Sequence, residues 1–227
     1  MTDRWGQRFG DPHAGVPGRR LFVGVPLPEE AASVIREVVD AVRSMPLPGG
    51  ARDVRWVRLD GLHLTLRFLG PTPDALVTPT MAAVERVANS ASGAIPIELA
   101  GSGTFPPGRR PRTLWIGMSK GVDGLSELAA ATESAVVSAG WQPDGRPFRP
   151  HLTLARSDGV AAGRMVADRL AAVMADRRIA CTIDRLGLFE SLTGGGPARY
   201  VTVTLRPLGR EPHSGEPMYH QTAPDPS

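Results

Sequence analysis

Residues 148–156 read FRPHLTLAR, and the HLTL at the centre of this stretch also occurs at residues 63–66. Successive side chains of a β-strand point to opposite faces. In a strand, each copy therefore places a histidine and a threonine on one face and two leucines on the other. The leucines would anchor the strand in a core. Two such strands facing each other would aim two imidazoles and two hydroxyls at a common point.

The composition is that of an ordinary soluble globular protein. The chain has 227 residues, of which 41% are hydrophobic and 22% charged, enough for one sizeable domain or two small lobes. The single cysteine, Cys181, cannot form an internal disulfide, and the first five residues lack the apolar core of a signal peptide. No apolar run is long enough to cross a bilayer. We therefore expect a cytoplasmic protein without a membrane partner, and a monomer.

The charge gives little information about partners. The net charge is +3, and the basic residues are almost all arginine, with Lys120 as the only lysine. Arginine suits phosphate recognition, but an excess of charge is more often a solvated surface. Charge alone therefore does not show nucleic-acid binding.

The two ends of the chain differ from its middle. Residues 1–19 and 208–227 are rich in polar residues, Gly and Pro and have no hydrophobic periodicity, so we predict a disordered extension and a disordered tail. Three of the five histidines lie there, namely His13, His213 and His220. This leaves His63 and His151 as candidates for a site.

The first half of the chain predicts alternating strands and helices. Helical spacing of apolar residues follows Pro28, and Gly70 with Pro71 is expected to stop the strand that carries the first HLTL. Pro79 leaves the start of the second helix open, because proline is tolerated in a first turn. The predicted elements are strand 20–26, helix 28–43, strand 54–57, strand 62–69, a helix within 73–90 and strand 95–99.

The second half repeats this order. We predict strand 113–118, a helix with an apolar face from Leu125 to Ala139 that ends at Gly140, the second HLTL strand, helix 162–175 and strand 180–188. A last strand, 199–205, is expected to be antiparallel. The repetition indicates an internal duplication. Two similar lobes related by a pseudo-twofold axis would bring His63 and His151 together across a central cleft, where ligand sites usually form.

These features resemble the two-histidine (2H) phosphoesterase superfamily, and within it the bacterial RNA 2',3'-cyclic phosphodiesterases, also called LigT-like proteins or 2'-5' RNA ligases. The resemblance covers about residues 20–207 and depends on both HxTx strings, the apolar strand before each, and residues 146–156. It implies a bilobal, duplicated α+β fold with mainly antiparallel sheet and outer helices. It also implies metal-free, cofactor-free hydrolysis of RNA or nucleotide 2',3'-cyclic phosphate ends to 2'-phosphomonoesters.

The candidate residues agree with this chemistry. Opening a cyclic phosphodiester needs an acid and a base, and histidine can serve as either near neutrality. Thr65 and Thr153 would donate hydrogen bonds to the nonbridging oxygens. The resemblance makes His63 the acid and His151 the base. It also assigns Arg156 to the phosphate, although ideal alternation turns Arg156 away unless the strand ends or bulges there.

Five further residues are weaker candidates. Alternation puts Arg67 on the His63 face, where we expect a rim contact or a solvated side chain. Phe22, Trp115 and Phe148 could stack on a nucleobase, although aromatic residues of apolar strands more often belong to the core. Tyr200 is open in the same way.

Other functions remain possible for the same residues. A 2'-5' RNA ligase would use a ribose 5'-hydroxyl in place of water, and a noncatalytic RNA- or nucleotide-binding module would keep only the phosphate site. A metal hydrolase is disfavoured, because two histidines without a carboxylate or cysteine in either motif provide too few ligands for zinc.

Overall fold

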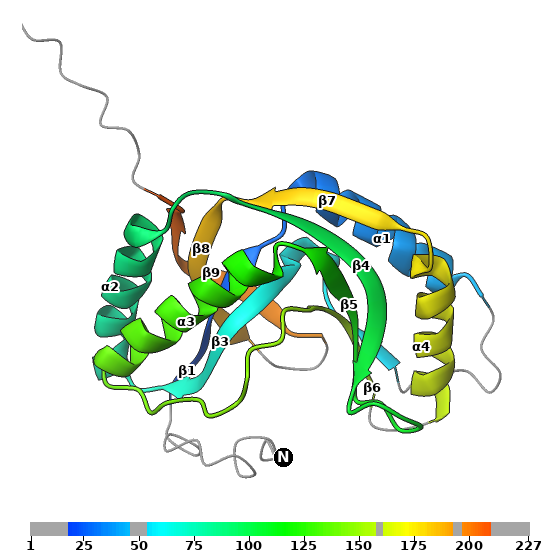
Figure 1. The fold of residues 1–227 in the computed structure, drawn as a ribbon. Helices are drawn as coiled ribbons and strands as arrows, with labels where there is room; N and C mark the ends of the chain where they lie inside the picture. The colour runs from blue at the N-terminus through cyan, green and yellow to red at the C-terminus, as the bar shows by residue number, and fades with distance from the viewer. Residues whose placement is uncertain (1–17, 46–53, 158–160, 193–196, 210–227) are drawn as a thin grey trace, which may run out of the picture.

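The computed structural model describes residues 18–45, 54–157, 161–192 and 197–209. Within these ranges the chain forms one curled antiparallel sheet of nine strands with four α-helices packed against it (Figure 1). The strands are β1 (Arg19–Pro26), β2 (Val54–Trp56), β3 (His63–Thr72), β4 (Ile95–Phe105), β5 (Thr113–Lys120), β6 (Leu152–Ser157), β7 (Arg178–Ile183), β8 (Arg185–Leu192) and β9 (Arg199–Pro207). The helices are α1 (Glu29–Arg43), α2 (Asp74–Ser90), α3 (Val122–Ser138) and α4 (Ala161–Met174).

The two HLTL copies lie at the centre of the sheet. Its order is β7-β4-β5-β6-β3-β1-β8-β9, and β2 pairs with β6. From the centre outwards, β3 and β6 are flanked by β1 and β5, then by β8 and β4, then by β9 and β7. A single registered pair, Leu64 with Leu152, joins the two central strands. The predicted α+β class with mainly antiparallel sheet is confirmed, and the sheet is continuous through both halves.

The helices pair across the two halves of the chain. Helix α1 contacts α4 and β7, whereas α2 contacts α3, β8 and β9. In Figure 1 the pair α2 and α3 lies at the left end of the sheet and the pair α1 and α4 at the right end. Each pair thus contains one helix from each half of the sequence.

Helix α1 shows why these segments fold as they do. Its residues Ala31, Ile35, Val38 and Val42 recur at helical spacing, and all four are buried. Glu29 and the next glutamate lie in the first turn, where the partial positive charge of the helix terminus favours acidic side chains. The opposite face carries polar residues to the surface.

Three predicted boundaries are wrong. Strand β3 continues through Gly70 and Pro71 to Thr72, because β3 pairs there with β1 only and a proline is compatible with a strand that lacks a partner on one side. Strand β4 continues to Phe105, beyond the predicted end at residue 99. The start of the second helix, which Pro79 left open, lies at Asp74 within the predicted range, and Pro79 lies beyond its first turn.

The third wrong boundary concerns the predicted strand 180–188. The chain turns at Asp184 and forms two strands instead, since β7 pairs with β4 in one half of the sheet and β8 pairs with β1 in the other.

The predicted flanks lie almost wholly outside the described residues, as do His13, His213 and His220. At the inner ends of the flanks, Arg19 starts β1, and Leu208 is buried and donates its backbone N–H to the Asp184 carbonyl. These two residues belong to the fold and not to the extensions. No helix in the described part of the chain has the length and apolarity to span a membrane.

Candidate active site

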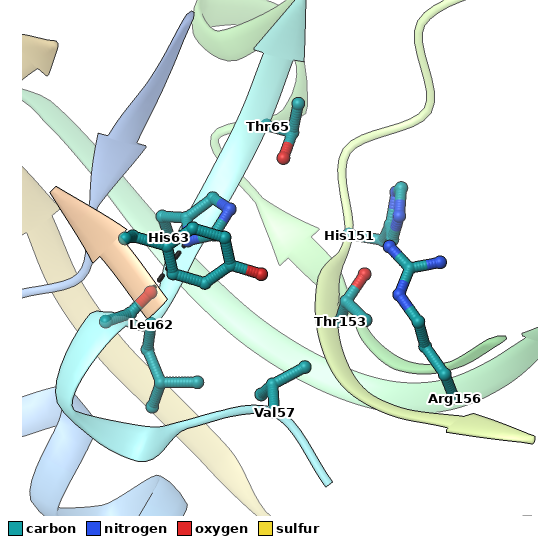
Figure 2. Close-up of a pocket in the computed structure, with 9 residues that line it drawn as sticks. Val57, Leu62, His63, Thr65, His151, Thr153 and Arg156 are labelled. Carbon is teal, nitrogen blue, oxygen red and sulfur yellow. Dashed lines mark hydrogen bonds between the residues drawn. The ribbon is translucent and has the colours of Figure 1, made fainter. Parts of the chain in front are cut away.

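The two central strands place the histidines and threonines as the alternation predicts. Leu64, Leu66, Leu152 and Leu154 are all buried, and the polar partners of both motifs line one pocket on the other face of the sheet (Figure 2). His63 is the first residue of β3, and His151 immediately precedes β6. The pocket is lined by Val57, Gly61, Leu62, His63, Thr65, His151, Thr153, Arg156 and Tyr200.

Both imidazoles are held in the same way. His63 Nδ1 lies 2.7 Å from the Gly61 carbonyl oxygen, a contact drawn as a dashed line in Figure 2. His151 Nδ1 lies 2.7 Å from the Arg149 carbonyl oxygen. A carbonyl can only accept, so each Nδ1 carries the hydrogen and donates it. Each Nε2 is therefore the nitrogen that is left to take or give a proton.

The surroundings of both rings favour the neutral imidazole. Burial lowers the pKa of His63, and the charges of Arg156 and His151 lower it further, while the hydrogen bond to Gly61 acts in the opposite direction. Burial and the Arg156 charge likewise lower the pKa of His151, against the hydrogen bond to Arg149. Both shifts therefore favour the neutral imidazoles in the free pocket.

Arg156 reaches the pocket through a β-bulge. In the pairing of β6 with β5, Thr153 registers with Trp115 and Ala155 with Leu114, so Leu154 has no partner. Leu154 and Ala155 are both buried, which resets the alternation of faces. Of the two alternatives that the sequence left open for Arg156, an end or a bulge of the strand, the structure shows the bulge. Figure 2 shows the guanidinium beside His151 and Thr153.

Strand β3 contains the same irregularity, and it overturns the prediction for Arg67. Thr65 registers with Gly24 and Arg67 with Val23, so Leu66 is left unpaired. Arg67 shares the core face with Val23, and its side chain is only 11% exposed. It forms ion pairs with Glu133 of α3 (2.7 Å) and Asp144 (3.0 Å). The expectation of a rim contact or solvated side chain on the His63 face is therefore wrong.

The candidate aromatic residues Phe22, Trp115 and Phe148 do not line the pocket. Phe22 is 2% exposed and stacks on His63 with 4.5 Å between ring centroids. This burial leaves no face of Phe22 for a base. Trp115 is half-buried against Phe105, 5.1 Å away, and Phe105 meets the His151 ring edge-on at 5.0 Å. Phe148 packs against the hydrophobic core.

Tyr200 is the pocket residue that the sequence left open. Its ring meets His63 edge-on at 4.6 Å, and it comes from β9 at the edge of the sheet. Burial raises the pKa of Tyr200, although Arg156 acts to lower it, so the phenol keeps its proton and can donate. Tyr200, Thr202 and Thr204 alternate with valine and leucine, a pattern typical of a strand with one polar face. Only the pairing of β9 with β8 decides which face meets His63.

Phosphate chemistry fits these groups. Two imidazole Nε2 atoms, two threonine hydroxyls, a guanidinium and a phenol surround one space, and none of the described residues that line it has a carboxylate or a thiol. Within the described ranges no group of three or more His, Cys, Asp and Glu side chains could hold a metal ion. The arrangement offers hydrogen-bond donors and one fixed positive charge to an anion, beside two groups that can transfer protons.

Comparison with known proteins identifies related sequences. A model of the 2'-5' RNA ligase superfamily matches residues 23–195. The RNA 2',3'-cyclic phosphodiesterase of Geobacillus stearothermophilus is 38% identical over 136 residues, covering 60% of this chain and 41% of that protein. That of Aeropyrum pernix is 36% identical over 107 residues, covering 47% of this chain and 58% of that protein. The matched regions thus span less than two thirds of either relative.

Solved structures show the same fold. TT0787 of Thermus thermophilus superposes with a TM-score of 0.65 at 24% identity, covering 85% of this chain and 100% of that one. Escherichia coli LigT complexed with 3'-AMP gives a TM-score of 0.63 at 24% identity, with 85% and 99% covered. Other E. coli LigT structures hold NADP+, ATP or phosphate. Proteins of this fold have thus been found with nucleotides bound.

Proposed function

Because the chain belongs to the 2'-5' RNA ligase superfamily of two-histidine phosphoesterases, we propose that it hydrolyses RNA 2',3'-cyclic phosphate ends to 2'-phosphomonoesters. One observation carries the proposal. Both histidines have Nδ1 tied to a carbonyl, and both line a single pocket together with Thr65, Thr153 and Arg156. A cyclic phosphodiester needs an acid and a base at one phosphorus, and this pocket supplies both.

The proposed reaction is a displacement at phosphorus. His151 Nε2 takes a proton from water while the water oxygen bonds to phosphorus. The bond from phosphorus to the ribose 3'-oxygen breaks, and that oxygen receives a proton from His63 Nε2. The product carries a 3'-hydroxyl and a 2'-phosphate. Thr65, Thr153 and Arg156 hold the nonbridging oxygens, where negative charge grows in the transition state.

The lowered pKa values of both histidines fit an anionic substrate. The acid must be protonated when the phosphate is bound, although both imidazoles favour the neutral form in the free protein. The negative phosphate attracts a proton to one of them and offsets the Arg156 charge. Substrate binding therefore raises the pKa of that histidine, which takes from solvent the proton that it later gives to the 3'-oxygen.

The order of the strands also supports an internal duplication. On either side of the central pair β3 and β6, the strands correspond in order: β1 to β5, β8 to β4 and β9 to β7. Each motif strand also has a bulge at the second leucine of its HLTL. We infer two pseudo-twofold-related lobes around the pocket. Unequal residues after each HLTL give the two lobes unequal tasks.

The test uses a short oligoribonucleotide that ends in a 2',3'-cyclic phosphate, with EDTA present. We expect the wild type to form the 2'-phosphate, and His63→Ala and His151→Ala each to lower kcat by about 10²- to 10⁴-fold. Arg164→Ala, at an exposed position of α4, is the control for general damage. Ring opening that is unaffected by both histidine variants would overturn the proposal, as would a requirement for metal.

The ligase alternative uses the same pocket and is favoured by the family to which the chain belongs. Adding a second oligoribonucleotide with a 5'-hydroxyl end to the same assay separates the two activities. A 2'-5'-linked product shows ligation, a 2'-phosphate shows hydrolysis, and tight binding without either product shows a binding module.

A further inference from the structure

Arg55 and Arg156 lie directly opposite each other on neighbouring strands. Strand β2 pairs with β6 in antiparallel register, and Arg55 is the partner of Arg156 in that pairing. Residues in such positions share a face of the sheet, and their Cβ atoms are about 4.5 to 5.5 Å apart. Arg156 lines the pocket. Arg55 therefore belongs to the pocket face of the sheet, beside Arg156.

The alternation of side chains along β2 gives the same orientation independently. Val57 lines the pocket (Figure 2), and its backbone N–H donates to the Leu154 carbonyl oxygen at 2.9 Å, which continues the pairing with β6. Trp56 packs against the core on the other face, and Val54 is buried. Residues two apart in a strand share a face, so Arg55 lies on the same face as Val57. Its side chain is exposed.

The pocket proper accounts for one phosphate, which Thr65, Thr153 and Arg156 would hold. Arg55 is not among the residues that line this space. It adds a second positive charge next to it, one strand away from Arg156. The nearest further anion in the proposed substrate is fixed by its chemistry. A 2',3'-cyclic phosphate occupies the end of a strand, so its only neighbouring phosphate is the one on the 5'-oxygen of the same nucleotide.

We propose that Arg55 binds the phosphate on the 5'-oxygen of the nucleotide that carries the cyclic phosphate. This proposal rests on the proposed function, which places the cyclic phosphate at Arg156. Successive phosphates advance by about 3.4 Å along a stacked strand. Two long arginine side chains that start about 5 Å apart can reach two such groups, and the guanidinium matches phosphate in a bidentate geometry.

This second phosphate site gives the enzyme a preference that does not depend on the base. Contacts to phosphate position a nucleic acid but carry no sequence information. The site would favour ends of RNA strands, and nucleotides with a 5'-phosphate, over a nucleoside cyclic phosphate. Arg55 is thus a residue that selects the substrate, whereas His63 and His151 carry out the reaction.

The test uses two substrates that differ only in this group. They are adenosine 2',3'-cyclic phosphate and the same compound with a 5'-phosphate. We expect kcat/KM of the wild type to be about 10-fold higher for the 5'-phosphorylated compound, the lower end of what a charged hydrogen bond contributes. In Arg55→Gln the ratio of the two kcat/KM values should fall to about 1. Arg55→Lys keeps the charge and should retain most of the preference.

The salt dependence provides a second measurement. For a hexaribonucleotide with a cyclic phosphate end, each phosphate contact contributes about 0.7 to the slope of log kcat/KM against log salt concentration. The slope should be shallower by about that amount in Arg55→Gln. Arg164→Gln removes the same charge from an exposed position of α4 and should keep both the wild-type slope and the wild-type ratio.

The outcomes separate this proposal from the proposed function. A wild type that opens both substrates equally well, or an Arg55→Gln variant that keeps the wild-type ratio, would overturn the second phosphate site while the enzyme activity stands. If the wild type opens neither substrate, isothermal titration calorimetry compares adenosine 2',5'-bisphosphate with adenosine 2'-monophosphate. Tighter binding of the bisphosphate in the wild type but not in Arg55→Gln then supports the site, and any other result refutes it.

Discussion

Local hydrogen bonds orient the His63 and His151 rings, whereas burial and the Arg156 charge determine their pKa values. Each Nδ1 is held by the carbonyl of the residue two positions earlier, so the motif itself provides the tautomer. The pKa of each ring depends on burial and on Arg156, which reaches the pocket only because β6 bulges. The motif therefore sets which nitrogen reacts, and the surrounding fold sets at what pH it does so.

The pH dependence of the proposed reaction follows from these shifts. Burial and Arg156 depress both pKa values, so the bell-shaped profile of kcat/KM, which reports the free enzyme, should centre below the ordinary value of about 6.5. Arg156→Gln removes a positive charge that disfavours the imidazolium, which raises both pKa values. The acidic limb should move to higher pH, and kcat/KM should fall by about 10- to 150-fold through the lost charged hydrogen bond.

Arg149→Gln is the matched control for this profile. Arg149 is exposed, and it contacts His151 through its backbone carbonyl, which the substitution keeps. Its profile should resemble that of the wild type. An acidic limb that stays in place in Arg156→Gln would show that the guanidinium does not tune the histidines.

At the scale of the elements, the bulge in β3 has a structural consequence beyond the pocket. It sends Arg67 to the core face, where the guanidinium reaches Glu133 of α3, Asp144 and the Gln142 carbonyl oxygen. Glu133 also accepts a hydrogen bond from the Asp144 backbone. These contacts tie the first motif strand to the segment that leads into the second.

Removing Arg67 should therefore lower the stability of the fold. Arg67→Met leaves Glu133 largely without its partner, and we expect the free energy of unfolding to fall by about 2 to 4 kcal/mol in urea titrations. Arg164→Met breaks an exposed pair with Asp168 one helical turn away and should cost only about 0.5 kcal/mol or less. Equal losses in the two variants would show that the buried network does not stabilise the fold.

At the scale of the whole molecule, the two halves are interlocked. One sheet runs through both, although a single registered pair joins its central strands. The helix pairs α1–α4 and α2–α3 each draw one member from either half of the sequence. Neither half can lose its helices without exposing the core of the other.

This arrangement predicts a single cooperative unfolding transition. Far-UV circular dichroism follows the helices. Among the described residues, tryptophan fluorescence follows Trp56 in β2, Trp115 in β5 and Trp141 after α3, so both halves of the sequence are represented. The two signals should change at the same urea concentration. Two separated transitions would mean that the lobes unfold independently.

The sequence by itself determined the family, the order of most elements and the histidine and threonine sides of the two motif strands. These features depend on local rules, namely the alternation of side chains in a strand and the helical spacing of apolar residues, which act within a few residues. The predicted pocket residues His63, Thr65, His151 and Thr153 follow from that alternation and from the repetition of the motif.

Only the tertiary structure decided what lies beyond each HLTL. Bulges arise from the pairing of β3 with β1 and of β6 with β5, so no local pattern shows that Arg156 turns towards the site while Arg67 turns away. Tyr200 likewise reaches His63 from an edge strand distant in sequence. The side that a residue takes after a bulge is set by its partner strand, and that partner is known only when the sheet is assembled.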